Sequence, residues 1–167
     1  MVTGALAEPA RRNAADPRES QVRQVLRSVM DPEIPVLSVI DLGIVRYVGS
    51  ANGRLRVGIT PTYSGCPATE VIQRSIREAL ERHGMGDVIV ETVLSPPWSS
   101  EWLSEEGRRK LAAFGIAAPR ARAPSRLTCP RCGGHDAERL SEFGSTPCKA
   151  HYRCRDCLEP FDVFKCI

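Results

Sequence analysis

The chain has 167 residues, of which 42% are hydrophobic and 26% are charged, a composition typical of a globular protein with a modest core. No apolar run approaches the roughly 18 residues of a membrane helix, and residues 1–19 lack the apolar region of a secretory signal, so we expect a cytoplasmic protein. The net charge of +3 is uneven: residues 108–131 carry seven Lys or Arg and no acid, which leaves −4 for the remainder. This basic stretch is typical of a solvated linker that could dock an acidic partner, and with only 5% aromatic residues nucleic-acid binding is disfavoured.

Residues 1–18 are rich in Ala, Pro and Arg without periodicity, which predicts a disordered tail. A helical apolar face then predicts a first helix from Ser20, formed by Val22, Val25, Leu26, Val29 and Met30. Asp31-Pro32 should end it, because proline disfavours helical geometry in the residue before it.

Two β-type segments follow at residues 43–49 and 54–60, with Asn52-Gly53 between them as a type I′ hairpin signal. A second amphipathic helix is predicted over Pro67–Arg82, capped by Gly84 and with Ala68, Ile72, Ile76, Ala79, Leu80 and His83 on one face. A third strand is predicted at residues 87–94 and one or two short helices at 99–114.

These elements predict an α+β fold: a small mixed α/β sandwich (helix, hairpin, helix, strand) with its helices on one face of the sheet, followed by a C-terminal zinc ribbon. The expected domains are a disordered tail at 1–18, an α/β domain at 19–115, a basic linker at 116–126 and the ribbon domain at 127–167.

The ribbon prediction rests on two CxxC pairs separated by 21 residues, namely Cys129, Cys132, Cys154 and Cys157. Each pair brings two sulfurs to one tight turn, as a tetrahedral structural zinc requires. The segment is too short to fold on its own core, so metal binding would supply its folding energy. Rubredoxin-type iron or a four-cysteine cluster uses similar pairs and is the alternative.

Three more residues near the ribbon are possible additional ligands: Cys148, His151 and Cys166. Each could equally be a small buried residue or, for the cysteines, a free thiol. We expect His135 to be a turn residue beside the first CxxC pair.

Cys66 stands apart from the other cysteines, between a strand end and a helix start. The positive end of a helix dipole should lower the pKa of its thiol, so a reactive or metal-holding thiol is one interpretation and a small residue under a loop is the other. Asp31, Glu33 and Asp41 could supply oxygen ligands near Cys66, although turn formation is the commoner role of such residues.

The segment Asp31-Pro32-Glu33-Ile34-Pro35 and the later Val39–Val45 run (VIDLGIV) resemble the opening signature of SufT-type and cytosolic iron–sulfur assembly proteins. The loop ending in Gly65-Cys66-Pro67 resembles the cysteine motif of that family. The resemblance becomes one to the PaaD family, the D component of the bacterial phenylacetyl-CoA epoxidase system, through further elements: Pro97-Trp98, Trp102, Gly107–Leu111, Phe114–Ala117, the double CxxC and Phe164-Lys165-Cys166.

This resemblance implies a compact α/β first domain and a place in aerobic phenylacetate breakdown. In that pathway a multicomponent di-iron monooxygenase epoxidises phenylacetyl-CoA, fed by a reductase with flavin and a [2Fe–2S] cluster. The D component would help to assemble or insert metal there. Its partners would be the oxygenase or reductase components and the iron–sulfur assembly machinery, and the domain type implies a homodimer as a further option.

The residues agree with an accessory rather than a catalytic role. The chain has no Glu-x-x-His pair for a di-iron site, no Gly-rich dinucleotide fingerprint and no ferredoxin spacing of cysteines. Two hypotheses follow. In the first, a maturation factor carries structural zinc and transiently holds iron or an iron–sulfur cluster at Cys66. In the second, a structural or coupling subunit remains bound to the oxygenase and transfers no metal.

Overall fold

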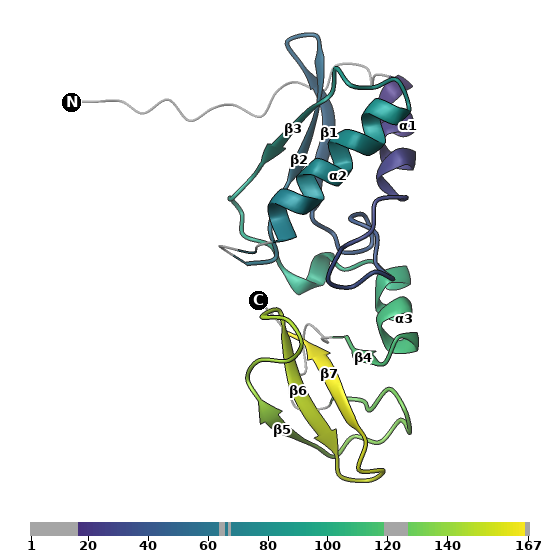
Figure 1. Ribbon diagram of the computed structural model, residues 1–167, viewed down its shortest axis with the longest axis vertical. Helices are drawn as coiled ribbons and strands as arrows, with labels where there is room; N and C mark the ends of the chain where they lie inside the picture. The colour runs from purple at the N-terminus through teal and green to yellow at the C-terminus, as the bar shows by residue number, and fades with distance from the viewer. Residues whose placement is uncertain (1–16, 64–65, 67, 119–126, 166–167) are drawn as a thin grey trace, which may run out of the picture.

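A computed structural model describes residues 17–63, 66, 68–118 and 127–165. Two units follow one another along the chain: an α/β unit built on a three-stranded sheet and a smaller unit built on a four-stranded sheet (Figure 1). The mixed α and β composition predicted from the sequence is confirmed, with the helices of the first unit lying over one face of its sheet (Figure 1).

The first sheet has the strand order β1-β2-β3, formed by Val45–Ala51, Arg54–Ile59 and Ile89–Thr92. β1 and β2 are antiparallel, and β3 runs parallel to β2. Asn52 and Gly53 join the hairpin with φ angles of 53° and 73°, the two positive values that a type I′ turn requires. The hairpin prediction is therefore confirmed, and the strand ends lie within two residues of the expected positions.

Helices α1 (Pro17–Leu26) and α2 (Ala68–Arg82) contact each other and pack against this sheet. The buried residues of α2 are those predicted from its periodicity: Ala68, Ile72, Ile76, Ala79 and Leu80. His83 was expected on the same face and is exposed instead, because the helix has ended and its Nδ1 lies 2.7 Å from the carbonyl of Ala79. Gly84 follows with a φ of 72°, as expected of a C-cap.

The first helix begins and ends earlier than the sequence predicted. Pro17 opens α1, so the expected tail at 1–18 is wrong at its last two residues, since proline suits the first turn of a helix. Residues 1–16 lie outside the described residues. At the other end the chain leaves the helix after Leu26, and Met30 forms an isolated bridge with Ser38 and is 45% exposed.

Val29 is buried without being helical, because its carbonyl accepts from the N–H of Val39 at 2.9 Å. The backbone N–H of Asp31 likewise donates to the carbonyl of Leu37 at 2.8 Å. Pairing between residues 29–31 and 37–39 thus replaces the last helical turn. It closes the loop that carries Asp31 and Glu33.

The predicted short helices over 99–114 are present as η1 (Ser100–Trp102) and α3 (Glu105–Ala113). Ser104 caps α3 by accepting a hydrogen bond from the N–H of Gly107 at 2.8 Å. This pair of elements leads the chain from the first unit to the second (Figure 1).

The second sheet has the order β4-β7-β6-β5, and its strands are Ile116–Ala117, Pro160–Phe164, Lys149–Cys154 and Ala137–Ser141. β4 pairs in parallel with β7, while the other two pairings are antiparallel. The linker expected at 116–126 is therefore wrong at its first two residues, because Ile116 and Ala117 are buried in this sheet. Residues 119–126 of that linker lie outside the described residues.

The two units share a hydrophobic core through the last strand. Phe164 is 1% exposed and belongs with Cys148 to the core cluster of the α/β unit rather than to the small cluster of the ribbon. The ring of Phe164 meets Trp98 edge to face, with 5.7 Å between centroids. The indole N–H of Trp98 in turn donates to the carbonyl of Leu42 at 3.0 Å. These contacts dock the ribbon on the segments that follow α1 and β3.

Candidate metal centres

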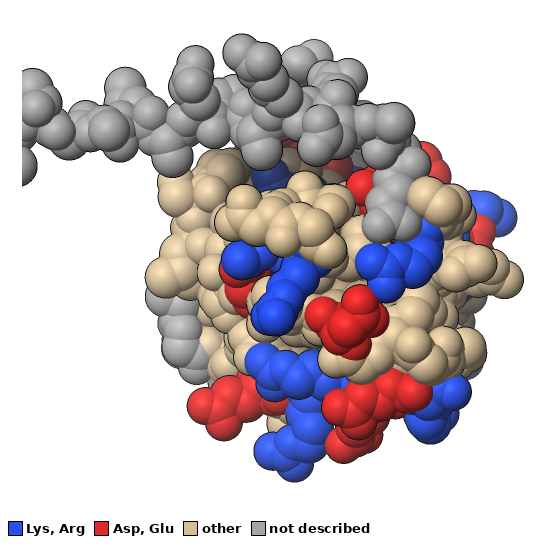
Figure 2. Space-filling model, turned by 90° about the horizontal axis from the view of Figure 1, so that it is seen from above, with Lys and Arg blue, Asp and Glu red and all other residues tan. Residues whose placement is uncertain are grey.

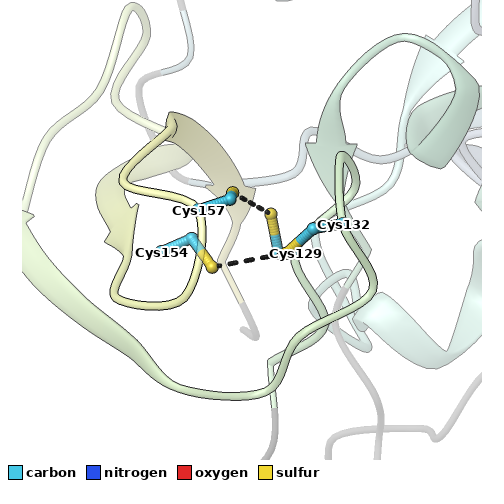
Figure 3. A group of neighbouring side chains, drawn as sticks. All are labelled: Cys129, Cys132, Cys154 and Cys157. Carbon is cyan, nitrogen blue, oxygen red and sulfur yellow. Dashed lines mark hydrogen bonds between the residues drawn. The ribbon is translucent and has the colours of Figure 1, made fainter.

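Four cysteines meet on two facing turns of the ribbon unit, one turn carrying Cys129 and Cys132 and the other Cys154 and Cys157 (Figure 3). Their ligand atoms all lie within 4.8 Å of one another. The Sγ atoms are 3.8 Å apart between Cys129 and Cys157 and 3.6 Å apart between Cys132 and Cys154. A disulfide needs about 2.05 Å, so these sulfurs are not bonded in pairs.

The sulfur separations fit a tetrahedral ion. Four bonds of about 2.3 Å at tetrahedral angles place neighbouring sulfurs about 3.8 Å apart. The first turn is held by the N–H of Gly133 donating to the carbonyl of Cys129 at 2.9 Å, and Gly133 adopts a φ of 76°. The N–H of Gly134 points to the sulfur of Cys132 at 3.4 Å, an interaction that stabilises a thiolate. The four cysteines therefore have the spacing needed to hold one metal ion.

The pKa values of the ribbon cysteines favour a bound cation. Burial raises the pKa of Cys129, but N–H donors of Cys132 and Arg131 outweigh that effect and lower it to about 7. The N–H of Gly134 lowers the pKa of Cys132, whereas its neighbouring sulfurs raise it, to about 12. The first thiolate forms readily, and its negative charge raises the pKa of the remaining thiols. All four thiols therefore ionise only when a metal ion compensates the charge.

The second candidate centre is a pocket around Cys66, which is half-buried just before α2. The sulfur of Cys66 accepts from the backbone N–H of Ala68 and interacts with the side chain of Thr69. The polar and thiol residues of its lining are Asp31, Glu33, Thr60, Thr62, Cys66, Thr69 and Cys148. The apolar residues of the lining are Ile34, Leu42, Ile44, Ile59, Pro61, Ile72 and Phe164.

The sequence predicted a lowered pKa for the Cys66 thiol, and this prediction is wrong. Burial raises the pKa of Cys66, and the carboxylates of Glu33 and Asp31 raise it further. The N–H of Ala68 at the helix start lowers it, but the opposing effects are larger. The thiol of Cys66 is therefore protonated near neutral pH, and only a nearby cation would favour its thiolate form.

Asp31 has a structural role within this pocket. Its Oδ1 accepts hydrogen bonds from the backbone N–H groups of Glu33 and Ile34, each at 2.8 Å, as in an Asx turn. This turn sets the direction of the Glu33 side chain toward the ribbon, where Cys148 lies 3.8 Å from Glu33 Oε2. Burial raises the pKa of Asp31 despite those two hydrogen bonds.

Cys148 reaches the pocket from the ribbon unit, immediately before β6, and is 5% exposed. Its carbonyl accepts from the N–H of Lys165 at 2.9 Å, and its sulfur lies 3.0 Å from the hydroxyl of Thr146. Burial, followed by the Glu33 carboxylate, raises the pKa of Cys148 to about 11, although Thr146 opposes the shift. Of the two additional candidates that the structure describes, Cys148 and His151, only Cys148 lines the pocket with Cys66.

Asp41, by contrast, lies outside the pocket lining and joins two segments of the α/β unit. Its Oδ2 accepts from the hydroxyl of Ser38 at 2.8 Å and from Lys110 Nζ at 2.6 Å, and its Oδ1 accepts from Ser104 at 3.2 Å. Burial raises the pKa of Asp41, but Lys110 and Ser38 outweigh it and hold the pKa below its usual value. Asp41 is thus engaged by Ser38, Ser104 and Lys110 and does not line the pocket around Cys66, in line with the structural role that was the commoner expectation.

The histidines near the ribbon are also engaged elsewhere. His151 Nδ1 lies 3.1 Å from Asp162 Oδ1 on the neighbouring strand β7, away from the pocket lining. His135 Nδ1 lies 3.3 Å from both the hydroxyl of Thr128 and the carbonyl of Leu127, as a turn residue would. Cys166 lies outside the described residues.

Sequence reasoning missed Tyr63 and Thr69. Burial raises the pKa of Tyr63, and the neighbouring Cys66, Glu33 and Cys148 raise it further. Both residues lie within three positions of Cys66 in the sequence. The sequence shows that both residues are close to Cys66 along the chain, but it does not show where their side chains point.

The basic stretch forms ion pairs wherever the structure describes it. Arg109 pairs with Glu106, Lys110 with Asp41, and Arg131 Nη1 lies 3.6 Å from Glu159. Arg108 Nη2 donates to the carbonyl of Ser100 at 2.8 Å. At the end of the α/β unit away from the ribbon, charges of both signs are interspersed (Figure 2). No helix of the described residues has the length and apolar character needed to cross a membrane.

Comparison with known proteins decides the family. The chain is 45% identical over 158 residues to a protein of Escherichia coli (strain K12) that is provisionally named as the D component of 1,2-phenylacetyl-CoA epoxidase. The alignment covers 92% of this chain and 96% of that protein. The chain belongs to the PaaD family. The same family resemblance was predicted from the sequence and is confirmed.

Two family models divide this PaaD-family chain into its two units. Residues 117–165 match the PaaD zinc beta ribbon domain, and residues 19–92 match an iron–sulfur cluster assembly protein. Over 95 residues the chain is 36% identical to an Fe-S protein maturation auxiliary factor of Porphyromonas gingivalis (strain ATCC BAA-308 / W83), and the match covers 56% of this chain and 90% of that protein.

A solved structure, the domain of unknown function DUF59 from Bacillus anthracis, matches with a TM-score of 0.53 and 27% identity. The match covers 58% of this chain and 93% of that chain. The α/β unit of this PaaD-family chain therefore has a DUF59-like fold, and the sequence prediction of its fold class is confirmed.

Proposed function

We propose that this chain is an accessory component of the phenylacetyl-CoA-epoxidising multicomponent monooxygenase of aerobic phenylacetate catabolism. It acts in the cytoplasm as a maturation factor for the di-iron or iron–sulfur centre of that system. Two similarities support the proposal: the name of the E. coli relative, and the match of residues 19–92 to iron–sulfur cluster assembly proteins.

The observation that carries the proposal is the pocket in which Cys66 and Glu33 lie. A thiol and a carboxylate together suit a borderline divalent ion such as ferrous iron. Since the thiol pKa is raised, Cys66 is a poor free nucleophile and stays protonated without cargo. Arrival of the cargo metal displaces the thiol proton to solvent, and return of the proton assists release. Cys66 and Glu33 therefore bind metal reversibly, as a carrier must.

For the ribbon we propose resident Zn²⁺, held by Cys129, Cys132, Cys154 and Cys157. Sulfur separations of 3.6 and 3.8 Å suit this ion, and a closed four-sulfur site leaves no open position for catalysis. In this proposal the metal stabilises the ribbon, and the ribbon docks the client, which is an oxygenase or reductase component. Metal analysis of the purified chain tests the assignment, because iron in place of zinc would contradict it.

The decisive experiment uses oxygenase and reductase components that already hold their full complement of iron and clusters. Epoxidation of phenylacetyl-CoA is measured with and without this chain. Maturation predicts equal turnover, because the chain acts before catalysis. In a parallel assay with metal-depleted components, the wild-type chain should restore turnover, and Cys66→Ser should bind the client but fail to restore it.

The alternative function is a stoichiometric structural or coupling role in the oxygenase complex, without metal transfer. It is favoured because the E. coli relative is named as a subunit of the epoxidase. Fully loaded components would then still need this chain in equimolar amount. If the Cys66→Ser variant restored metal-depleted components at the wild-type rate, metal transfer through the Cys66 thiol would also be contradicted.

A further inference from the structure

The pocket contains thiols from both structural units. Cys66 lies before α2 of the α/β unit, whereas Cys148 lies before β6 of the ribbon. The sulfur of Cys148 is 3.8 Å from Glu33 Oε2, and the same Glu33 carboxylate raises the pKa of both thiols. Glu33 thus lies beside Cys148 and lines the same pocket as Cys66.

The backbone around Cys148 fixes its position. Its carbonyl accepts from the N–H of Lys165 at 2.9 Å, which extends the β6–β7 pairing by one residue. Phe164, adjacent to Lys165, packs on Trp98 and lines the same pocket. The contact that docks the ribbon on the α/β unit therefore also delivers the thiol of Cys148 to the pocket.

The charges around the pocket favour a bound cation. The carboxylates of Glu33 and Asp31 both act on the two thiols. The charge of Lys149 acts against these carboxylates and lowers the pKa of Cys148 and of Asp31. Lys149 Nζ, however, lies 3.6 Å from Asp162 Oδ2, which partly neutralises its charge. Two thiolates beside two carboxylates would leave a large uncompensated negative charge in a half-buried space. A divalent cation is the natural counter-charge.

The ligands that the pocket offers suit a single ion. A [2Fe–2S] cluster is held by four cysteines, whereas the pocket is lined by two thiols with the Glu33 carboxylate beside one of them. Two thiolates, one carboxylate and a water molecule would complete the coordination of one first-row ion.

We propose that Cys148 is the second thiolate ligand of this pocket, so that a single borderline divalent ion of the ferrous type bridges the two units through Cys66, Cys148 and Glu33. The inference rests on the proposed function and assigns its cargo as a single ion rather than a cluster. Because Cys66 and Glu33 belong to the α/β unit and Cys148 to the ribbon, separation of the two units would break the site and release the ion.

The spacing of these ligands suits a carrier rather than a permanent site. Among the described residues, only the four ribbon cysteines form a group of three or more metal-ligating side chains whose ligand atoms lie within 4.8 Å of one another. Cys66, Cys148 and Glu33 do not form such a group, so at least one of them must move to reach a common ion. That movement lowers the net free energy of binding, so the ion is held less tightly.

The test uses the full chain with Zn²⁺ already in the ribbon and Co²⁺ as the probe, under reducing, oxygen-free conditions. Wild type should bind one further Co²⁺ with a thiolate-to-cobalt charge-transfer band. Cys148→Ser and Cys66→Ser should each lose about half of the band intensity and bind Co²⁺ at least roughly tenfold more weakly. The matched control is Ala150→Ser, which places a hydroxyl at another buried site of β6, outside the pocket, and should behave as wild type.

Retention of one Zn²⁺ per chain shows that each variant keeps its ribbon. Should Cys148→Ser lose its zinc, X-ray absorption of the wild-type chain with Co²⁺ bound decides the matter, because two sulfur ligands support the proposal and one overturns it. A Cys148→Ser variant with the wild-type band and affinity also overturns it. That result would leave the proposed function standing, since Cys66 alone could carry the cargo and the turnover assay judges that role separately.

Discussion

Substitution of Phe164 by alanine tests whether aromatic packing docks the ribbon on the α/β unit. Phe164 is 1% exposed and contacts Trp98 edge to face. A buried Phe removes about 150–250 Å² from water, which at about 25 cal/mol/Å² corresponds to roughly 4–6 kcal/mol as an upper estimate. Comparable Phe→Ala substitutions cost about 3–5 kcal/mol. We expect Phe164→Ala to lower the free energy of unfolding by about 4 kcal/mol.

The loss should fall on the contact between the units, because Phe164 belongs to the core of the α/β unit, whereas the zinc that we propose at the four cysteines would stabilise the ribbon independently. Urea unfolding gives the magnitude, and hydrogen exchange of the Trp98 indole N–H, which donates to Leu42, reports the contact. Zinc content should be unchanged. The control is Phe143→Ala, which removes a 63% exposed ring beside Lys165 and should cost less than about 1 kcal/mol.

Equal small losses for Phe164→Ala and Phe143→Ala, with the Trp98 indole still protected, would refute the reasoning. The two units would then be held together by something other than this aromatic contact. The position of Cys148 in the pocket would lose its main support as well.

Three further predictions concern the metal sites and acid stability. Cys129→Ser should abolish tight metal binding and unfold the ribbon, so circular dichroism and proteolysis showing it folded would contradict the structural role of the metal. Asp41→Asn should cost roughly 1–3 kcal/mol near neutral pH by weakening the contact with Lys110. Because the folded pKa of Asp41 lies below its usual 3.8, this contribution is present above that pH and disappears as pH falls through the folded pKa, so urea unfolding of the two proteins should converge at low pH. With the pKa of both pocket thiols raised, Co²⁺ affinity should rise about hundredfold per pH unit near neutrality if Cys66 and Cys148 both lose protons, and about tenfold if only one does.

The features predicted well from the sequence are those that depend on neighbours along the chain. Asn52-Gly53 specifies its own positive φ angles, the periodicity of α2 identifies its buried face, and the two CxxC pairs identify their own turns. In each case the physical cause lies within a few residues. Such local signals survive folding because tertiary contacts do not oppose them.

The errors arise where tertiary contacts override local signals. Val29 continues the helical pattern, yet its carbonyl pairs with Val39 and the helix ends at Leu26. Asp41 resembles a metal ligand in the sequence, yet its carboxylate accepts a hydrogen bond from Lys110, which is 69 residues away. Cys148 is 115 residues from Glu33, so no sequence spacing could have paired them.

The corrected pKa of Cys66 changes what its chemistry can be. A helix start alone would favour a thiolate and hence a nucleophile, but burial and the carboxylates of Glu33 and Asp31 reverse the balance. A thiol with a raised pKa reacts slowly with electrophiles, because little of it is thiolate, whereas a cation that neutralises the carboxylates can displace its proton. The same residues that suppress nucleophilic reactivity thus favour metal capture. If Cys66 in the metal-free chain reacted with iodoacetamide faster than a free cysteine, this balance would be wrong and a nucleophilic role would have to be reconsidered.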